Sequence, residues 1–183
     1  MGYRRTMADE HPTDALDVAL LRALHEHPRI GDLELSRTVK VARATVQGRL
    51  RRMDENGVIR DWAPSLDVAA AGFPVQAFVT LEIAQGALDE VTADLVAIPE
   101  VLEAHVTTGS YDVVCRVACA SHAQLQDVLV RINQSPSVSR STSVMILSVL
   151  IPPRALPLLE TRATPATRAP AYRHGNGDPR TSE

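Results

Sequence analysis

Apolar residues in the first third of the chain recur at the spacing of α-helices. Leu16, Leu20 and Leu24 lie four residues apart, and Thr13 before them is a suitable N-cap. The pattern predicts a second, short helix over residues 32–39 and a third helix over residues 42–56, which Gly57 ends. A short helix, a tight turn and a longer helix form the helix-turn-helix pattern.

The residues after the third helix suggest a small β wing. Residues 58–62 and 65–68 have the composition of two short strands that could pair. We therefore predict a winged helix-turn-helix domain over residues 13–64, preceded by a flexible N-terminus at residues 1–12. Residues 65–72 are predicted as a linker strand.

Beyond Gly72 the pattern becomes that of alternating strands and helices. Strands are predicted over residues 75–83, 101–109, 111–119 and 141–151, and helices over residues 88–98 and 122–134, the second with Ser121 as its N-cap. The order βαββαβ is the ferredoxin-like pattern, so residues 73–151 are predicted as a second domain and the fold class as α+β. In residues 152–183 Pro, Arg, Thr and Gly occur without periodicity, which predicts a disordered tail.

Charge separates the two predicted domains. The whole chain has a net charge of −3, but residues 1–64 hold 11 basic and 10 acidic side chains (net +1), and residues 65–150 hold 3 basic and 9 acidic ones (net −6). Residues 36–53 include six basic side chains and no acidic one. Such a concentration on one predicted helix favours contact with a polyanion.

The third helix carries side chains suited to contact with DNA. Arg43, Gln47 and Arg51 lie four residues apart, and Arg and Gln form bidentate contacts with base edges. Other basic side chains are expected to hold phosphates, and a buried ion pair is the alternative role for Arg49. The predicted DNA-binding residues are Lys40, Arg43, Ala44, Thr45, Gln47, Gly48, Arg49, Arg51 and Arg52.

Other classes of function are not indicated. Cys115 and Cys119 would lie about 13 Å apart along one strand, too far for a disulfide, so buried thiols are predicted, with a redox sensor as the alternative. The six His are scattered, and we expect no metal and no cofactor. No apolar run approaches the roughly 18 residues of a membrane span, and the first residues lack the apolar segment of a signal peptide. We expect a cytoplasmic protein.

Four segments together resemble one family of transcription factors. The recognition-helix segment is "TVQGRLRRMDENGVI", the helix before it is "RIGDLELSRTVKVA", the entry into the second domain is "AAAGFPVQAFVTLEI", and a turn between strands is "TTGSYDVVCRV". In this order they resemble the Lrp/AsnC family (leucine-responsive regulator / asparagine-activator) of bacterial and archaeal regulators. The resemblance covers about residues 14–150.

The resemblance implies a sequence-specific transcriptional regulator and not an enzyme. The expected partners are double-stranded promoter DNA, a small effector such as an amino acid, and further copies of the chain, in a homodimer that assembles into higher homo-oligomers such as an octamer. The effector is expected near the turn between the middle strands. The effector-binding residues implied are His105, Thr107, Gly109, Ser110, Tyr111, Asp112, Thr142 and Ser143.

Three residues depart from the family pattern. Ser110 stands where the family commonly has Asp, which removes one negative charge from the implied effector site. Ala42 replaces the usual Ser N-cap of the recognition helix, at a cost of about 1 kcal/mol. Lys40 occupies a turn position where the family often has Gly, so a positive φ there would strain its backbone.

Two other functions are alternatives to the effector-gated regulator. An architectural protein of the same fold would bind DNA without any effector, and the loss of an acidic residue at position 110 favours it. An enzyme resembling the decarboxylases of haem biosynthesis would need His and Tyr clustered on a cleft. Of the three Tyr only Tyr111 lies outside the predicted tails, which argues against this chemistry.

Overall fold

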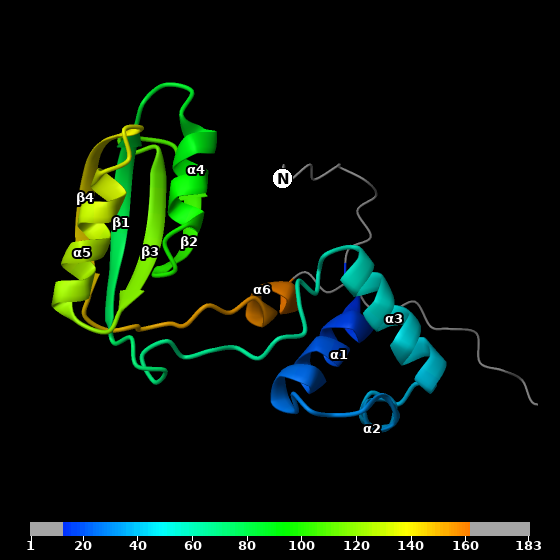
Figure 1. The fold of residues 1–183 in the computed structure, drawn as a ribbon. Helices are drawn as coiled ribbons and strands as arrows, with labels where there is room; N and C mark the ends of the chain where they lie inside the picture. Colours follow the sequence, from blue (N-terminus) through cyan, green and yellow to red (C-terminus); the bar gives the residue numbers. More distant parts are fainter. Residues whose placement is uncertain (1–12, 162–183) are drawn as a thin grey trace, which may run out of the picture. The chain divides into compact units, whose positions relative to one another are not determined.

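The computed structural model describes residues 13–161, which divide into two compact units (Figure 1). Of these residues, 13–62 and 153–161 belong to the first unit and 63–152 to the second. The predicted flexible N-terminus and residues 162–183 of the predicted tail lie outside the described residues. Within residues 13–161, no helix has both the length and the apolar character that crossing a membrane requires.

The first unit contains the three predicted helices, α1 (Ala15–Glu26), α2 (Asp32–Thr38) and α3 (Arg43–Glu55). Their core consists of Leu20, Ala23, Leu35, Val46 and Met53. Helix α1 begins one residue later than predicted, because Asp14 and not Thr13 is its N-cap. The Asp14 carboxylate accepts from the backbone N–H groups of Leu16 and Asp17, and Asp17 accepts in return from the Asp14 N–H, which completes a capping box.

The turn between α2 and α3 confirms the expected strain at Lys40. Its φ is +56°, and it is the only non-glycine residue with positive φ among the described residues. The turn is closed by a hydrogen bond from the Val41 N–H to the Ser36 carbonyl, 3.0 Å long. Helix α3 then begins after Ala42, which provides no side-chain cap, as expected.

The predicted wing and the linker strand are not formed in the described chain. The N–H groups of Val58 and Ile59 donate back to the carbonyl of Met53, at 2.8 and 3.1 Å, and so close the end of α3 instead of joining a ladder. Pro64 has no N–H to donate. The Asp67 carboxylate then accepts from the N–H groups of Ala69 and Ala70, which bends the chain into a turn where a linker strand was expected.

The second unit has the predicted βαββαβ order. Its elements are β1 (Val75–Ile83), α4 (Leu88–Val96), β2 (Val101–Val106), β3 (Val113–Cys119), α5 (His122–Asn133) and β4 (Val138–Ile146). The four strands form an antiparallel sheet in the order β2-β3-β1-β4, and α4 and α5 lie against one of its faces (Figure 1). This is the ferredoxin-like arrangement.

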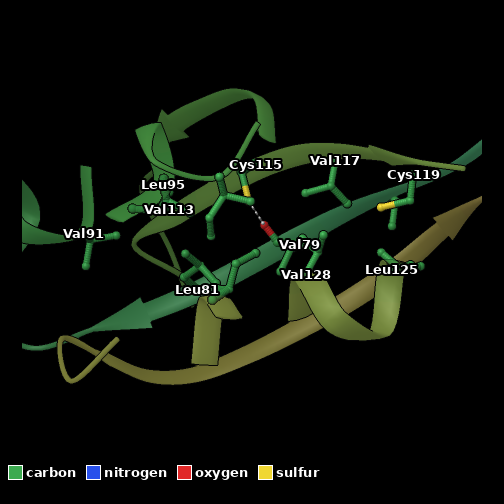
Figure 2. Close-up of a cluster of buried hydrophobic side chains, with 13 residues drawn as sticks. Val79, Leu81, Val91, Leu95, Val113, Cys115, Val117, Cys119, Leu125 and Val128 are labelled. Carbon is green, nitrogen blue, oxygen red and sulfur yellow. Dashed lines mark hydrogen bonds between the residues drawn. The ribbon is translucent and has the colours of Figure 1, made fainter. Parts of the chain in front are cut away.

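The core of this unit lies between the sheet and its two helices. Alternate residues of the central strands point into it, among them Val79, Cys115 and Val117, and they meet Val91 of α4 and Val128 of α5 (Figure 2). The Cys115 thiol lies 3.5 Å from the carbonyl oxygen of Val79, and burial raises the pKa of this thiol to about 11. The prediction of buried thiols is therefore confirmed for both cysteines.

The last strand and the tail differ from the prediction. Strand β4 begins three residues earlier than residue 141 and ends at Ile146, because its partner β1 begins at Val75, directly after Pro74, and offers no further ladder. The prediction of disorder is wrong for Leu156–Glu160, which form a short helix, α6, in the first unit. Pro157 lies in its first turn, where a proline is compatible with a helix.

The two residues with positive φ beside α3 allow a matched test of backbone strain. An L residue in the left-handed region costs about 1–2 kcal/mol. A glycine there avoids this strain, but part of the gain in stability is lost because glycine makes the unfolded chain more flexible. We expect Lys40→Gly to raise the free energy of unfolding of the first unit by roughly 0.5 kcal/mol. We expect Gly57→Ala, at φ +68° with no atom within 4 Å of the new Cβ, to lower it by about 1 kcal/mol. Urea denaturation measures both, and a change of the same sign in the two variants would contradict the assignment of strain.

Candidate DNA-binding face and effector turn

Helix α3 is held to the start of α1 by a cluster of four charged side chains. Asp17 is completely buried, and its two carboxylate oxygens accept from Arg49 at 3.0 Å and from Arg52 at 2.6 Å. Asp14, the N-cap of α1, accepts from the same Nη1 of Arg49. Two carboxylates therefore balance two guanidinium groups at this point.

Burial and hydrogen bonding act in opposite directions on Asp14. Burial alone would raise the pKa of its carboxyl, but the hydrogen bonds from Arg49 and from the backbone N–H groups of Asp17 and Leu16 outweigh it, and the net pKa lies below its usual value. The same hydrogen bond with Asp14 raises the pKa of Arg49. Asp14 and Arg49 are therefore both charged at neutral pH.

The cluster changes the assignment of two predicted DNA-binding residues. Arg49 and Arg52 were expected to contact DNA, but their side chains are turned towards α1 and their charges are paired there. For Arg49 the structure supports the alternative that the sequence had left open, a partly buried ion pair. Arg52, which is about two-fifths exposed, is paired with Asp17, so we now expect it to act within the chain and not on a phosphate.

The remaining predicted residues form the exposed side of α3. Arg43, Ala44, Gly48 and Arg51 are exposed, as are Thr45 at its N-terminal end and Lys40 in the turn before it. Gln47 is also exposed, but its amide nitrogen donates to the Asp32 carboxylate of α2 at 2.8 Å, so it contributes to the packing of the two helices as well. Gly48 has no atom within 4 Å of where a Cβ would lie, so packing within this chain does not require a glycine.

The acidic half of the cluster was not predicted from the sequence. Asp14 and Asp17 are spaced three residues apart at the start of α1, and Arg49 and Arg52 have the same spacing on α3. Residues three apart lie on the same side of a helix. The sequence therefore contained a signal for a contact between the two helices: an acidic pair on one helix and a basic pair on the other, both with a spacing of three residues.

The turn that joins β2 to β3, Thr107–Asp112, is fixed by its own hydrogen bonds. The Thr107 N–H donates to the Asp112 carbonyl at 2.8 Å, and the Thr107 hydroxyl donates to the Tyr111 carbonyl at 2.7 Å. Gly109 has φ +118°, a conformation that favours glycine. The Asp112 carboxylate accepts from the Ile83 N–H at 2.9 Å and so attaches the turn to the end of β1.

A shallow hollow of about 280 Å³ adjoins this turn. Of the predicted effector residues, Thr107 and Asp112 line it, and the rest of its wall was not predicted. This unpredicted wall consists of Ile83, Ala84, Gln85, Gly86, Leu88 and Val106. The volume is near the lower end of the roughly 300–1,000 Å³ that small-molecule sites occupy.

The other predicted effector residues do not converge on this hollow within one chain. His105 pairs with Val114, Val114 with Thr80, and Thr80 with Thr142, so His105 and Thr142 lie at opposite ends of one row across the sheet. Three strand spacings, about 14 Å, separate them. Ser143 follows Thr142 on the same strand and therefore faces the opposite side. Gly109, Ser110 and Tyr111 are exposed at the turn.

The described residues offer no cluster for a metal ion. Among residues 13–161, no three His, Cys, Asp or Glu side chains lie together in a group that could hold one.

Comparisons with known proteins match both units. Residues 14–54 match a family model described as the AsnC-type helix-turn-helix domain, and residues 76–156 match one described as the Lrp/AsnC ligand binding domain. The HTH-type transcriptional regulator Rv2324 of Mycobacterium tuberculosis is 34% identical over 140 residues, which cover 75% of this chain and 94% of that protein.

Solved structures share the same arrangement. E. coli AsnC matches with a TM-score of 0.73 and 27% identity, over 79% of this chain and 98% of its own. The transcriptional regulator NMB0573 of Neisseria meningitidis, solved as an L-Met complex, matches with a TM-score of 0.73 over 81% of this chain and 98% of its own. Because only 24% of the aligned residues are identical, this second match shows a shared fold.

Two adjacent arginines on α3 are expected to have different roles: Arg51 contacts DNA, and Arg52 contacts Asp17 within the chain. We expect Arg51→Gln to lower the slope of log affinity against log salt concentration by about one and to leave the stability unchanged, because Arg51 is exposed. We expect Arg52→Gln to leave that slope unchanged and to lower the free energy of unfolding by about 1–3 kcal/mol, because buried Asp17 loses a partner. A salt titration and a urea denaturation of each variant provide the measurement. Equal slopes in the two variants would contradict the division.

The lowered pKa of Asp14 makes the first unit sensitive to acid. Its contribution to stability is complete above the unfolded pKa of about 3.9 and is lost as the pH falls through the lower folded pKa. In Asp14→Asn the side chain still caps α1, since Asn is an equally good N-cap, but the charge is absent. We expect the variant to melt at a lower temperature than the unaltered chain at pH 6 and to approach it below pH 4. Melting curves that stay parallel from pH 6 to pH 3 would exclude this role of Asp14.

Proposed function

Since the chain belongs to the Lrp/AsnC family of transcriptional regulators, we propose that it binds operator DNA with the exposed side of α3 and that an amino acid adjusts this binding through the second unit. The observation that carries the proposal is the division of basic side chains on and beside α3. Arg49 and Arg52 are paired with carboxylates, while Lys40, Arg43 and Arg51 are exposed on or just before the helix.

The exposed side of α3 suits the major groove of DNA. Arg43 and Arg51 lie two turns apart along the helix, and the small residues Ala44 and Gly48 lie between them. A glycine within a helix costs roughly 0.5–1 kcal/mol relative to alanine, and nothing inside this chain requires it. With no Cβ at Gly48 and only a methyl group at Ala44, this surface permits close approach of the helix to base edges and methyl groups.

The turn Thr107–Asp112 suits the two charged groups of an amino acid. Asp112 is the one carboxylate of the turn, and because a carboxylate accepts several hydrogen bonds, its contact with Ile83 leaves capacity for an ammonium group. The backbone around Gly109 allows a carboxylate to approach N–H groups closely. The L-Met complex of the regulator with the same fold supports an amino acid as the class of ligand.

A second copy of the chain is proposed to complete the site and to cover the open face of the sheet. The face opposite α4 and α5 exposes Phe78 and Val144 in adjacent positions of β1 and β4. A two-fold axis along the strands would place β2 of one copy over β4 of the other. His105 of one copy would then face Thr142 of the second copy, although the two lie at opposite edges within one chain.

The decisive experiment measures DNA binding, ligand response and assembly in the same samples. The probe is a labelled duplex from upstream of the gene of this protein, compared with a scrambled duplex by fluorescence anisotropy at several salt concentrations and with each of the twenty amino acids. Sedimentation velocity gives the mass of the assembly under the same conditions. We expect at least tenfold tighter binding to the first duplex, a dimer or larger assembly, and a shift in affinity or mass with one or a few amino acids.

Asp112→Asn is the matched variant for the ligand response. Its carbonyl still accepts from the Ile83 N–H, so the turn is retained, but the charge that pairs with an ammonium is lost. We expect unaltered DNA binding without ligand and a weaker response to the amino acid. Sequence-selective binding that no amino acid changes would instead indicate the architectural alternative. No binding to either duplex at low salt would refute the assignment of α3.

A further inference from the structure

A segment from the far end of the chain lies on the helix that holds α3. Helix α6, Leu156–Glu160, packs against α1 and belongs to the same unit. The Arg22 side chain of α1 donates from Nε and Nη2 to the same carboxylate oxygen of Glu160, at 3.1 and 2.7 Å. The family model for the helix-turn-helix domain covers residues 14–54, so it includes Arg22 but not α6.

Helix α1 has two faces in contact with the rest of the unit. Leu20 and Ala23 belong to the core formed with α2 and α3. Val18 is 4% exposed, yet it lies two residues before Leu20 and therefore about 200° away around the helix, outside that core. Arg22 follows Val18 by one turn, so both lie on the side where α6 is bound.

The contact with α1 is also what makes α6 helical. A five-residue helix is too short to be stable by itself in water, so packing must supply its order. Leu156 and Leu159 are half-buried, whereas Leu158 between them is 67% exposed. The ion pair of Arg22 and Glu160 is exposed, and such pairs contribute little by themselves, so the two half-buried leucines supply most of the attachment.

We propose that residues 153–161 stabilise the DNA-binding unit by packing on the second face of α1. This packing fixes α1 in place, and α1 in turn holds α3 through Asp14 and Asp17. The partner of this face of α1 is the C-terminal segment of the chain. Helix α1 then lies between α6 on one side and α3 on the other, and loss of α6 loosens the contact that orients α3. The consequence for DNA affinity rests on the proposed function, whereas the consequence for the stability of α1 does not.

The proposal is tested by comparing two truncated chains, one without α6 and one with it. One ends at Pro152 and lacks α6, and the other ends at Thr161 and retains it. Hydrogen exchange of the backbone amides is measured in both, with the amides of β1 and β3 as the internal reference. We expect exchange in α1 and α3 to accelerate roughly five- to tenfold in the chain that ends at Pro152 and to stay at the full-length rate in the other. DNA affinity is expected to fall in parallel.

Single substitutions in α6 supply a matched pair. Leu159→Ser removes a half-buried side chain and is expected to accelerate exchange in α1, while Leu158→Ser changes an exposed one and is expected to leave it unchanged. Equal exchange in the two truncated chains, or equal effects of the two serines, would overturn the proposal. If no chain, full-length included, binds DNA, the proposed function fails, and the exchange rates still decide the role of α6.

Discussion

The first unit depends on one buried charge, the carboxylate of Asp17. It is fully enclosed, and Arg49 and Arg52 donate hydrogen bonds to it from α3, a helix more than thirty residues further along the chain. A buried carboxylate without such partners is costly, so the sequence that places it there also dictates where α3 must lie. The core of Leu20, Leu35 and Met53 supplies the apolar free energy of the unit, while the charged cluster fixes the orientation of α3 within it.

The same cluster explains the charge pattern that the sequence presents. The six basic side chains of residues 36–53 form two groups: Arg49 and Arg52 are paired with carboxylates, and the other four are exposed. The sequence alone does not separate the two groups, because the carboxylates lie on another helix. Helix and strand positions that depend on local periodicity were predicted closely, and β1 over Val75–Ile83 was predicted to the residue. Features that depend on distant partners were missed. Strand β4 ends where its partner β1 begins. The predicted wing does not form because Val58 and Ile59 donate hydrogen bonds back to Met53, and α6 forms because it packs against α1.

The ligand-binding region shows a further limit of prediction from one chain. The turn Thr107–Asp112 could be identified from its sequence, because Gly109 and the polar residues around it form a local structure. The hollow beside it is lined mainly by the segment that follows β1, which no motif marked. His105 and Thr142 are placed by the register of all four strands, at opposite edges of the sheet. Local sequence can identify candidate residues of such a site, but the pairing of strands determines which of them lie close together.

The two Cys give the second unit its own internal reporter. Both are enclosed in the core of this unit, and none of the other described residues is a Cys (Figure 2). Thiols in that core react with an alkylating reagent only when the sheet and its helices separate, because the reagent needs access to the thiolate. The rate of thiol labelling of the unaltered chain therefore follows the opening of the second unit alone. The opening of this half of the protein can be timed without introducing a single label.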